Sequence, residues 1–153
     1  MENGVCEKVN DTLKLVSKEE VLILTLDSIR LLCRNTNCKS AFTNLDTINL
    51  VLDSIKILEP KIHEKSLHAL NNLVFNCDLG VQKFAQSQGC EILMESLKKW
   101  EKYLNLTFST LRIIIYVLRF PKCRKRFLKL KIKPFLKKYL KVAYNLYTQL
   151  HII

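Results

Sequence analysis

Six arginine and asparagine side chains recur along the chain at a spacing that could build one binding surface. Positions 30/72/115, 34/76/119 and 27/69/112 are related by offsets of 42 and then 43 residues. Within each predicted helix the second position lies three residues after the first, and the third lies seven residues after the first. Residues at these spacings share one face of a helix. Arginine can fork onto a carboxylate, and asparagine can pair with a peptide group through both a donor and an acceptor. The candidate peptide-binding residues are Arg30, Arg34, Asn72, Asn76, Arg112 and Arg119. An ordinary polar helix surface is the alternative interpretation.

A basic segment near the C-terminus is the second candidate surface. All 14 acidic residues lie in residues 1–118, where 14 basic residues balance them, whereas residues 119–153 carry 11 basic residues and no acidic one. Such a segment can bind anionic lipid, nucleic acid or an acidic protein surface. A solvated helix face is the simpler interpretation. The residues that would carry binding are Lys122, Arg124, Lys125, Arg126, Lys137 and Lys138.

No set of residues predicts catalysis or a metal centre. The 6 cysteines include no C-x-x-C pair, and the 3 histidines complete no zinc pattern. No nucleophile, base and orienting group converge in the sequence. We therefore expect a non-catalytic protein with no cofactor and no small-molecule substrate. Free thiols are expected, as in a reducing cytosol.

The N-terminus and the apolar runs predict a cytoplasmic protein. Residues 1–20 contain no uninterrupted apolar core of the kind a secretory signal needs. The longest apolar run, residues 113–118, is far shorter than the roughly 20 residues that span a bilayer. We expect the protein in the cytoplasm, including the cell cortex.

The elements that would position the candidate residues belong to an internal repeat. Three twelve-residue blocks align without a gap: LLCRNTNCKSAF, LVFNCDLGVQKF and YVLRFPKCRKRF, ending at Phe42, Phe84 and Phe127. A period of 42 to 43 residues is typical of armadillo and HEAT units, which bury their apolar faces by stacking on one another. In such an array the third helices line a concave surface, where the candidate arginines and asparagines would form rungs.

The flanks of each block predict the same order of helices. Amphipathic helices are expected at residues 18–34, 61–76 and 107–119, the first after a capping box at Ser17 and the second after Pro60. A short helix carries the repeated phenylalanine, and further helices are expected at residues 46–58, 90–104 and 133–146. Gly89 is expected to end a helix in the left-handed conformation. The columns predicted to be buried are residues 31/73/116, 32/74/117, 33/75/118, 51/93/136 and 55/97/140.

The predicted fold class is all-α. The 3 glycines and 3 prolines argue against a many-turned β structure. We expect an armadillo/HEAT-like α-solenoid of about three helical repeats, the last of them incomplete. Residues 1–128 would form the repeats as a single domain, and residues 129–153 a basic helical tail or part of an incomplete repeat. An uncapped solenoid end exposes an apolar face, so self-association through that end is also expected.

Three segments resemble the first repeats of the synembryn family in order and spacing. They are SIRLLCRNTNC at residues 28–38, SLHALNNLVFN at residues 66–76 and FSTLRIIIYVLRF at residues 108–120. The resemblance covers roughly residues 20–128. Family members are cytosolic armadillo-like chaperones and guanine-nucleotide exchange factors for the α subunits of heterotrimeric G proteins. They are several times longer, and the position before Leu-Arg at which they tend to carry an acidic residue is Thr110 here.

The resemblance implies a partner and a binding site. In the family the concave face holds the C-terminal helix of Gα, whose chain end lies near arginines and an asparagine of the early repeats. By motif these are Arg30, Arg34 and Asn72 here, three of the residues that the repeat offset selects. The resemblance therefore implies Gα binding in G-protein coupled receptor signalling, by an exchange factor and folding chaperone or a truncated form of one. A generic armadillo peptide scaffold remains an alternative, as does a nucleic-acid or lipid-surface binder acting through residues 122–141.

Overall fold

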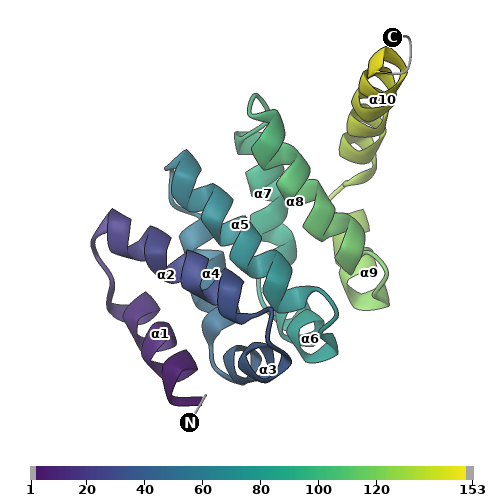
Figure 1. Ribbon diagram of the computed structural model, residues 1–153. Coiled ribbons are helices and arrows are strands. Elements are labelled where there is room, and N and C mark those ends of the chain that lie inside the picture. Colours follow the sequence, from purple (N-terminus) through teal and green to yellow (C-terminus); the bar gives the residue numbers. More distant parts are fainter. Residues whose placement is uncertain (1–2, 151–153) are drawn as a thin grey trace.

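The computed structural model describes residues 3–150, with the side chains of residues 4–141, and this part of the chain is all-helical (Figure 1). It contains ten helices and no strand within those described residues. The helices are α1 (Asn3–Leu15), α2 (Glu19–Leu32), α3 (Thr36–Asn44), α4 (Thr47–Ile55), α5 (Pro60–Val74), α6 (Asp78–Gln86), α7 (Gly89–Lys99), α8 (Leu104–Val117), α9 (Pro121–Lys129) and α10 (Lys133–Leu150). The predicted all-α class is confirmed.

Helix lengths recur in the same order along the chain. Helices α3 and α6 each have 9 residues, α4 and α7 have 9 and 11, and α5 and α8 have 15 and 14. We refer to α3, α4 and α5 as the first triplet and to α6, α7 and α8 as the second triplet. Helix α9 again has 9 residues, and α10 follows it. Helices α2, α5 and α8 lie side by side as one layer, while α10 extends away at the far end (Figure 1).

Helix starts follow from local chemistry. Pro60 and Pro121 stand at the first turns of α5 and α9, where the N–H that proline lacks would have no helical partner. The Asn35 side chain caps α3 by accepting hydrogen bonds from the backbone N–H groups of Asn37 and Cys38, at 2.8 and 3.1 Å. Helices α2, α5 and α8 confirm the three predicted amphipathic helices, with ends shifted by a few residues.

Two sequence expectations about helix ends are wrong. The capping box at Ser17 does not form, because α2 begins at Glu19 after Lys18, whose side chain makes no capping hydrogen bond. Gly89 does not end a helix: it is the first residue of α7, and no described glycine has a positive φ. A Cβ at Gly89 would overlap the ring of Phe84, so this position requires a glycine for close packing. The N-terminal helix α1 was not predicted.

The repeated phenylalanines lie at the centre of the core. Phe42, Phe84 and Phe127 are each fully buried, as the repeat predicts. Most residues of the predicted core columns in α2, α4, α5, α7 and α8 are buried as well. Three are exposed instead: Leu31, Phe75 and Leu140. Leu31 is on the outer side of α2, and Phe75 follows the last residue of α5 with extended backbone, which turns its ring outward onto Tyr116. The exposure of Leu140 is analysed with α10 below.

A buried polar chain joins α4, α5, α7 and α8. The carbonyl of Ile55 can only accept, so Nδ1 of His63, 2.8 Å away, carries the ring proton. The unprotonated Nε2 then accepts a hydrogen bond from the Ser96 hydroxyl at 2.7 Å. The Ser96 hydroxyl oxygen lies 3.2 Å from the Thr110 hydroxyl oxygen. Burial lowers the pKa of His63, with a smaller contribution from nearby Lys99. His63 is therefore a neutral, hydrogen-bonded core residue.

Replacing a repeated phenylalanine should cost far more stability than replacing an exposed one. We expect Phe84→Ala to lower the free energy of unfolding by about 3–5 kcal/mol, because it leaves a cavity in the core. Phe75→Ala is the matched control, since this ring is 42% exposed, and it should cost about 1 kcal/mol. Urea denaturation followed by circular dichroism measures both, and equal losses would contradict the packing described here.

The buried His63 predicts a loss of stability in mild acid. Its pKa is lower in the folded protein than the value of about 6.5 in the unfolded chain, so the unfolded state binds the proton first. Stability should be constant above that pH and fall below it, by up to about 1.4 kcal/mol per pH unit, until folded His63 is protonated as well. Denaturation between pH 7 and 5.5 tests this, with the half-buried His68 as the control position. His63→Gln should remove the slope and His68→Gln should keep it; the same slope in both variants would refute the assignment.

Candidate functional site

A polar groove of about 380 Å³ lies across α2, α5 and α8. The three helices meet here because α5 packs against α2 on one side and α8 on the other. The groove brings together four of the six candidate residues from the repeat: Arg30, Arg34, Asn72 and Arg112. It is completed by Leu67, His68, Asn71 and Ser109.

Arg30 and Asn72 are held in place by contacts between helices. The Arg30 Nε donates to Oδ1 of Asp27 at 3.1 Å, and Lys65 Nζ of α5 donates to the other carboxylate oxygen at 2.7 Å. Partial burial acts to raise the pKa of Asp27, but the hydrogen bonds from Lys65 and Arg30 outweigh it and the pKa is lowered. The Asn72 Nδ2 donates to the backbone carbonyl of Arg30 at 2.7 Å. Asn72 therefore ties α5 to α2, with part of its donor capacity already used.

Arg34 and Arg112 carry the charge that is available to a ligand. Both side chains are exposed, and neither makes a hydrogen bond or ion pair with any described residue. Asp27, the carboxylate next to Arg30, is shared between Arg30 and Lys65. The groove therefore has a positive surplus at its arginines. It suits an anionic group that can accept several hydrogen bonds, such as a carboxylate.

Asn76 and Arg119, the other two candidates, do not line the groove. Helix α5 ends at Val74, and Asn76 takes a left-handed conformation with φ of 51° beyond that end. Its backbone N–H donates to the Tyr116 hydroxyl at 2.8 Å, and the Arg119 guanidinium lies 5.6 Å from the centre of the same ring. The backbone is extended at Phe75 and left-handed at Asn76, so the helical spacing no longer places Asn76 on that face, and the Arg119 side chain lies over the Tyr116 ring. They gather around Tyr116 instead.

The sequence reasoning missed His68, Asn71 and Ser109. The signal was present, because Ser109 lies three residues before Arg112, and His68 lies four before Asn72. One further helical turn toward the N-terminus at the same spacing would have found His68 and Ser109, whereas Asn71 adjoins Asn72 in the sequence. The repeat offset did not identify these residues, because the equivalent positions do not carry the same residue type in each repeat.

The basic candidates near the C-terminus divide into exposed and engaged side chains. Lys122, Arg124, Lys125 and Lys137 are exposed and make no ion pair with a described residue. Lys138 pairs with Glu101, and this hydrogen bond raises the pKa of Lys138. The exposed members lie on two different helices, α9 and α10.

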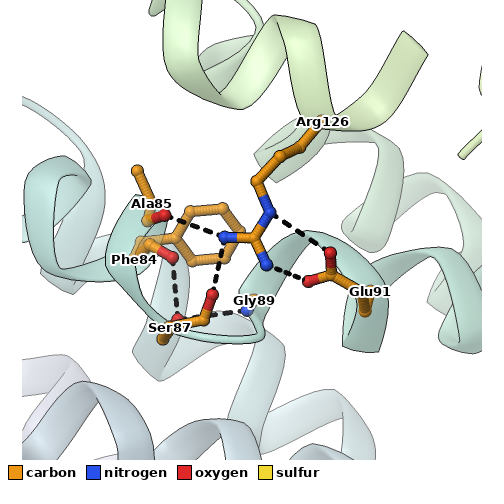
Figure 2. A network of polar contacts seen from close by, with 6 residues as sticks. All are labelled: Phe84, Ala85, Ser87, Gly89, Glu91 and Arg126. Atoms are coloured by element: carbon orange, nitrogen blue, oxygen red, sulfur yellow. Dashed lines mark hydrogen bonds and ion pairs between the residues drawn. The ribbon is translucent and has the colours of Figure 1, made fainter. Parts of the chain in front are cut away.

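Arg126 is committed to contacts within the protein (Figure 2). Its Nη1 donates to the carbonyls of Ala85 and Ser87, at 2.8 and 2.7 Å, where the chain passes from α6 to α7. The Nε donates to Glu91 at 3.2 Å, and Nη2 donates to the other oxygen of the same carboxylate. Arg126 thus fastens α9 to the second triplet and is not available to an external anion.

Lys83 makes the equivalent contact one triplet earlier. Its Nζ donates to the carbonyls of Asn44 and Leu45, at 3.1 and 3.3 Å, where α3 passes to α4. The basic residues Lys83 and Arg126 are 43 positions apart, and the carbonyls of Leu45 and Ser87 that they contact are 42 apart. A basic side chain before each of these two phenylalanines therefore contacts the preceding short helix at the same place.

Two of the buried cysteines have a raised thiol pKa. Burial raises the pKa of the Cys33 thiol to about 12. The hydrogen bond with Cys123 and burial together raise the pKa of the Cys90 thiol. Within the described residues, no three His, Cys, Asp or Glu side chains come together as metal ligands.

Comparison of the chain with protein-family models, with curated proteins and with solved structures finds no match. None of the described helices combines the length and hydropathy that crossing a membrane requires.

Removing the Arg126 side chain should destabilise the fold. Arg126→Met leaves the Ala85 and Ser87 carbonyls and the Glu91 carboxylate without their donor, and this side chain is only 28% exposed. We expect the free energy of unfolding to fall by about 1–3 kcal/mol. Arg124→Met, at an exposed position two residues away, should change it by less than about 0.5 kcal/mol. Equal effects in urea denaturation would show that the contacts of Arg126 do not stabilise the fold.

Proposed function

We propose that this chain is a non-catalytic peptide-binding protein whose polar groove holds the C-terminal segment of a G-protein α subunit. The observation that carries the proposal is the convergence of three arginines: Arg30 from α2, Arg34 from the turn after α2, and Arg112 from α8. Two of these three side chains are unpaired among the described residues. A terminal carboxylate offers the acceptors that these donors need.

The fold that we propose for this function is an armadillo-like solenoid. Its support is the recurrence of helix lengths in the two triplets, the buried phenylalanine in each block, and the matching contacts of Lys83 and Arg126. In such an array successive third helices present equivalent positions to one concave face. This arrangement accounts for a groove built from α2, α5 and α8.

The choice of Gα as partner rests on the resemblance of residues 28–38, 66–76 and 108–120 to synembryn repeats. Binding that favours the nucleotide-free conformation of Gα would shift its population and weaken nucleotide affinity by the same coupling factor. Exchange then requires no covalent chemistry from this chain. The same binding would stabilise a Gα folding intermediate, which is the chaperone activity.

Arg34 should carry a measurable share of peptide affinity. We expect Arg34→Ala to weaken binding of a fluorescent Gα C-terminal peptide roughly ten- to a hundredfold, because a hydrogen bond to a charged group contributes about 1.5–3 kcal/mol. Fluorescence anisotropy at physiological salt measures the change. Arg34 is exposed and unpaired among the described residues, so the variant should fold normally, which circular dichroism checks.

The control for this experiment is Arg124→Ala, which removes an exposed arginine of α9 outside the groove. It should leave the affinity unchanged. Equal weakening in both variants would exclude the groove and indicate a general basic surface, whose binding should also fall steeply with salt concentration. Equal affinity for a scrambled peptide with the same terminus would indicate a generic peptide scaffold without preference for Gα.

A further inference from the structure

A second, apolar groove of about 310 Å³ lies between α8 and α10. Its walls are Phe108, Leu111 and Ile115 from α8 and Leu136, Tyr139 and Leu140 from α10, with Arg112 at the edge. Arg112 also lines the polar groove, so the two grooves meet at this side chain. Ile115 is 52% and Leu140 67% exposed, which is high for large apolar residues that share one groove.

Comparison with the two triplets shows how α10 differs from α4 and α7 among the described helices. Leu140 is equivalent by the repeat offset to Ile55 of α4 and Leu97 of α7, which are only 3% and 0% exposed. Helix α4 is covered by α5, and α7 is covered by α8. Helix α10 carries an apolar residue at the equivalent position, Leu140, but no described helix covers that residue. Relative to α10, the groove lies where α5 lies relative to α4 and where α8 lies relative to α7.

The Tyr139 hydroxyl of the α10 wall differs from its equivalent in α7. Tyr139 is 3% exposed, and its hydroxyl has no hydrogen-bond partner among the described residues. Its equivalent in α7 is Ser96, whose hydroxyl lies 3.2 Å from the hydroxyl of Thr110 in the covering helix α8.

The charge around the groove selects the occupant. Arg112 borders it, and two exposed lysines, Lys137 and Lys141, directly follow the wall residues Leu136 and Leu140 in the sequence. Residues 119–153 contain no acidic side chain. A second copy of the chain would bring the same lysines against these, so like charges oppose self-association here.

We infer that the α8–α10 groove binds an amphipathic helix of a partner protein, with its apolar face on Ile115 and Leu140 and acidic residues beside Arg112 and the α10 lysines. The partner helix completes a triplet with α9 and α10. This site shares Arg112 with the polar groove, but the inference does not depend on the identity of the ligand there.

The probe that tests this is a synthetic peptide of α5, residues 60–74, which covers α4 in the first triplet. With Lys61→Glu and Lys65→Glu it becomes acidic, and the unchanged sequence is the basic counterpart. We expect saturable binding of the labelled acidic peptide to the full chain by anisotropy, and at least tenfold weaker binding of the basic one. Equal affinities, or no binding of the acidic peptide at 100 μM of the chain (about −5.5 kcal/mol), would overturn the inference.

Variants of the chain locate the site. Leu140→Asp should weaken binding of the acidic peptide at least tenfold. Leu128→Asp, at an exposed leucine of α9 outside the groove, should leave this affinity unchanged. Both leucines are exposed, so folding should survive, and Arg34→Ala should leave this binding unchanged. Equal effects of the two leucine variants would overturn the inference. So would a concentration-dependent dimer in sedimentation that Leu140→Asp abolishes, because the occupant would then be a second copy.

Discussion

The packing of α5 between α2 and α8 is the constraint on which the rest of the structure depends. Helix α5 buries a complete face, and Ala69 in the middle of that face has no exposed surface, so neighbouring helices can approach it closely. Asn72 fixes the register by donating to the backbone of α2, and His63 connects α5 to α4 and α7. If α5 were displaced, the arginines of α2 and α8 would no longer face one groove.

The stacking also explains why basic residues have two different roles in one chain. Lys83 and Arg126 lie immediately before buried phenylalanines and point at the carbonyls left open where a short helix ends. Those carbonyls accept hydrogen bonds from the charged groups, so these side chains hold neighbouring helices together. Arg34 and Arg112 have no such carbonyl or carboxylate within reach among the described residues, and their charge stays available for a ligand. Contacts with the neighbouring helices therefore separate the cations that stabilise the packing from those whose charge stays available.

Much of the fold could be predicted from the repeat, whereas details at helix ends could not. The spacing of apolar residues located α2, α5 and α8, and the aligned blocks predicted that Phe42, Phe84 and Phe127 are buried, because both depend on local pattern. Asn76 left the predicted face because the backbone is extended at Phe75 and left-handed at Asn76, which the spacing does not encode. The repeat also predicted burial of Leu140, but a position is buried only when a neighbouring helix is present to cover it.

The central claim is that the polar groove across α2, α5 and α8 binds the terminal carboxylate of a peptide. A double-mutant cycle tests this claim most directly. Four affinities are needed: the unmodified chain and Arg34→Ala, each with a free-acid and a C-terminally amidated Gα peptide. The account predicts that amidation weakens binding to the unmodified chain at least tenfold and has little effect on Arg34→Ala, a coupling of about 1.5–3 kcal/mol. The same loss on amidation in both proteins would contradict a contact between Arg34 and the peptide carboxylate.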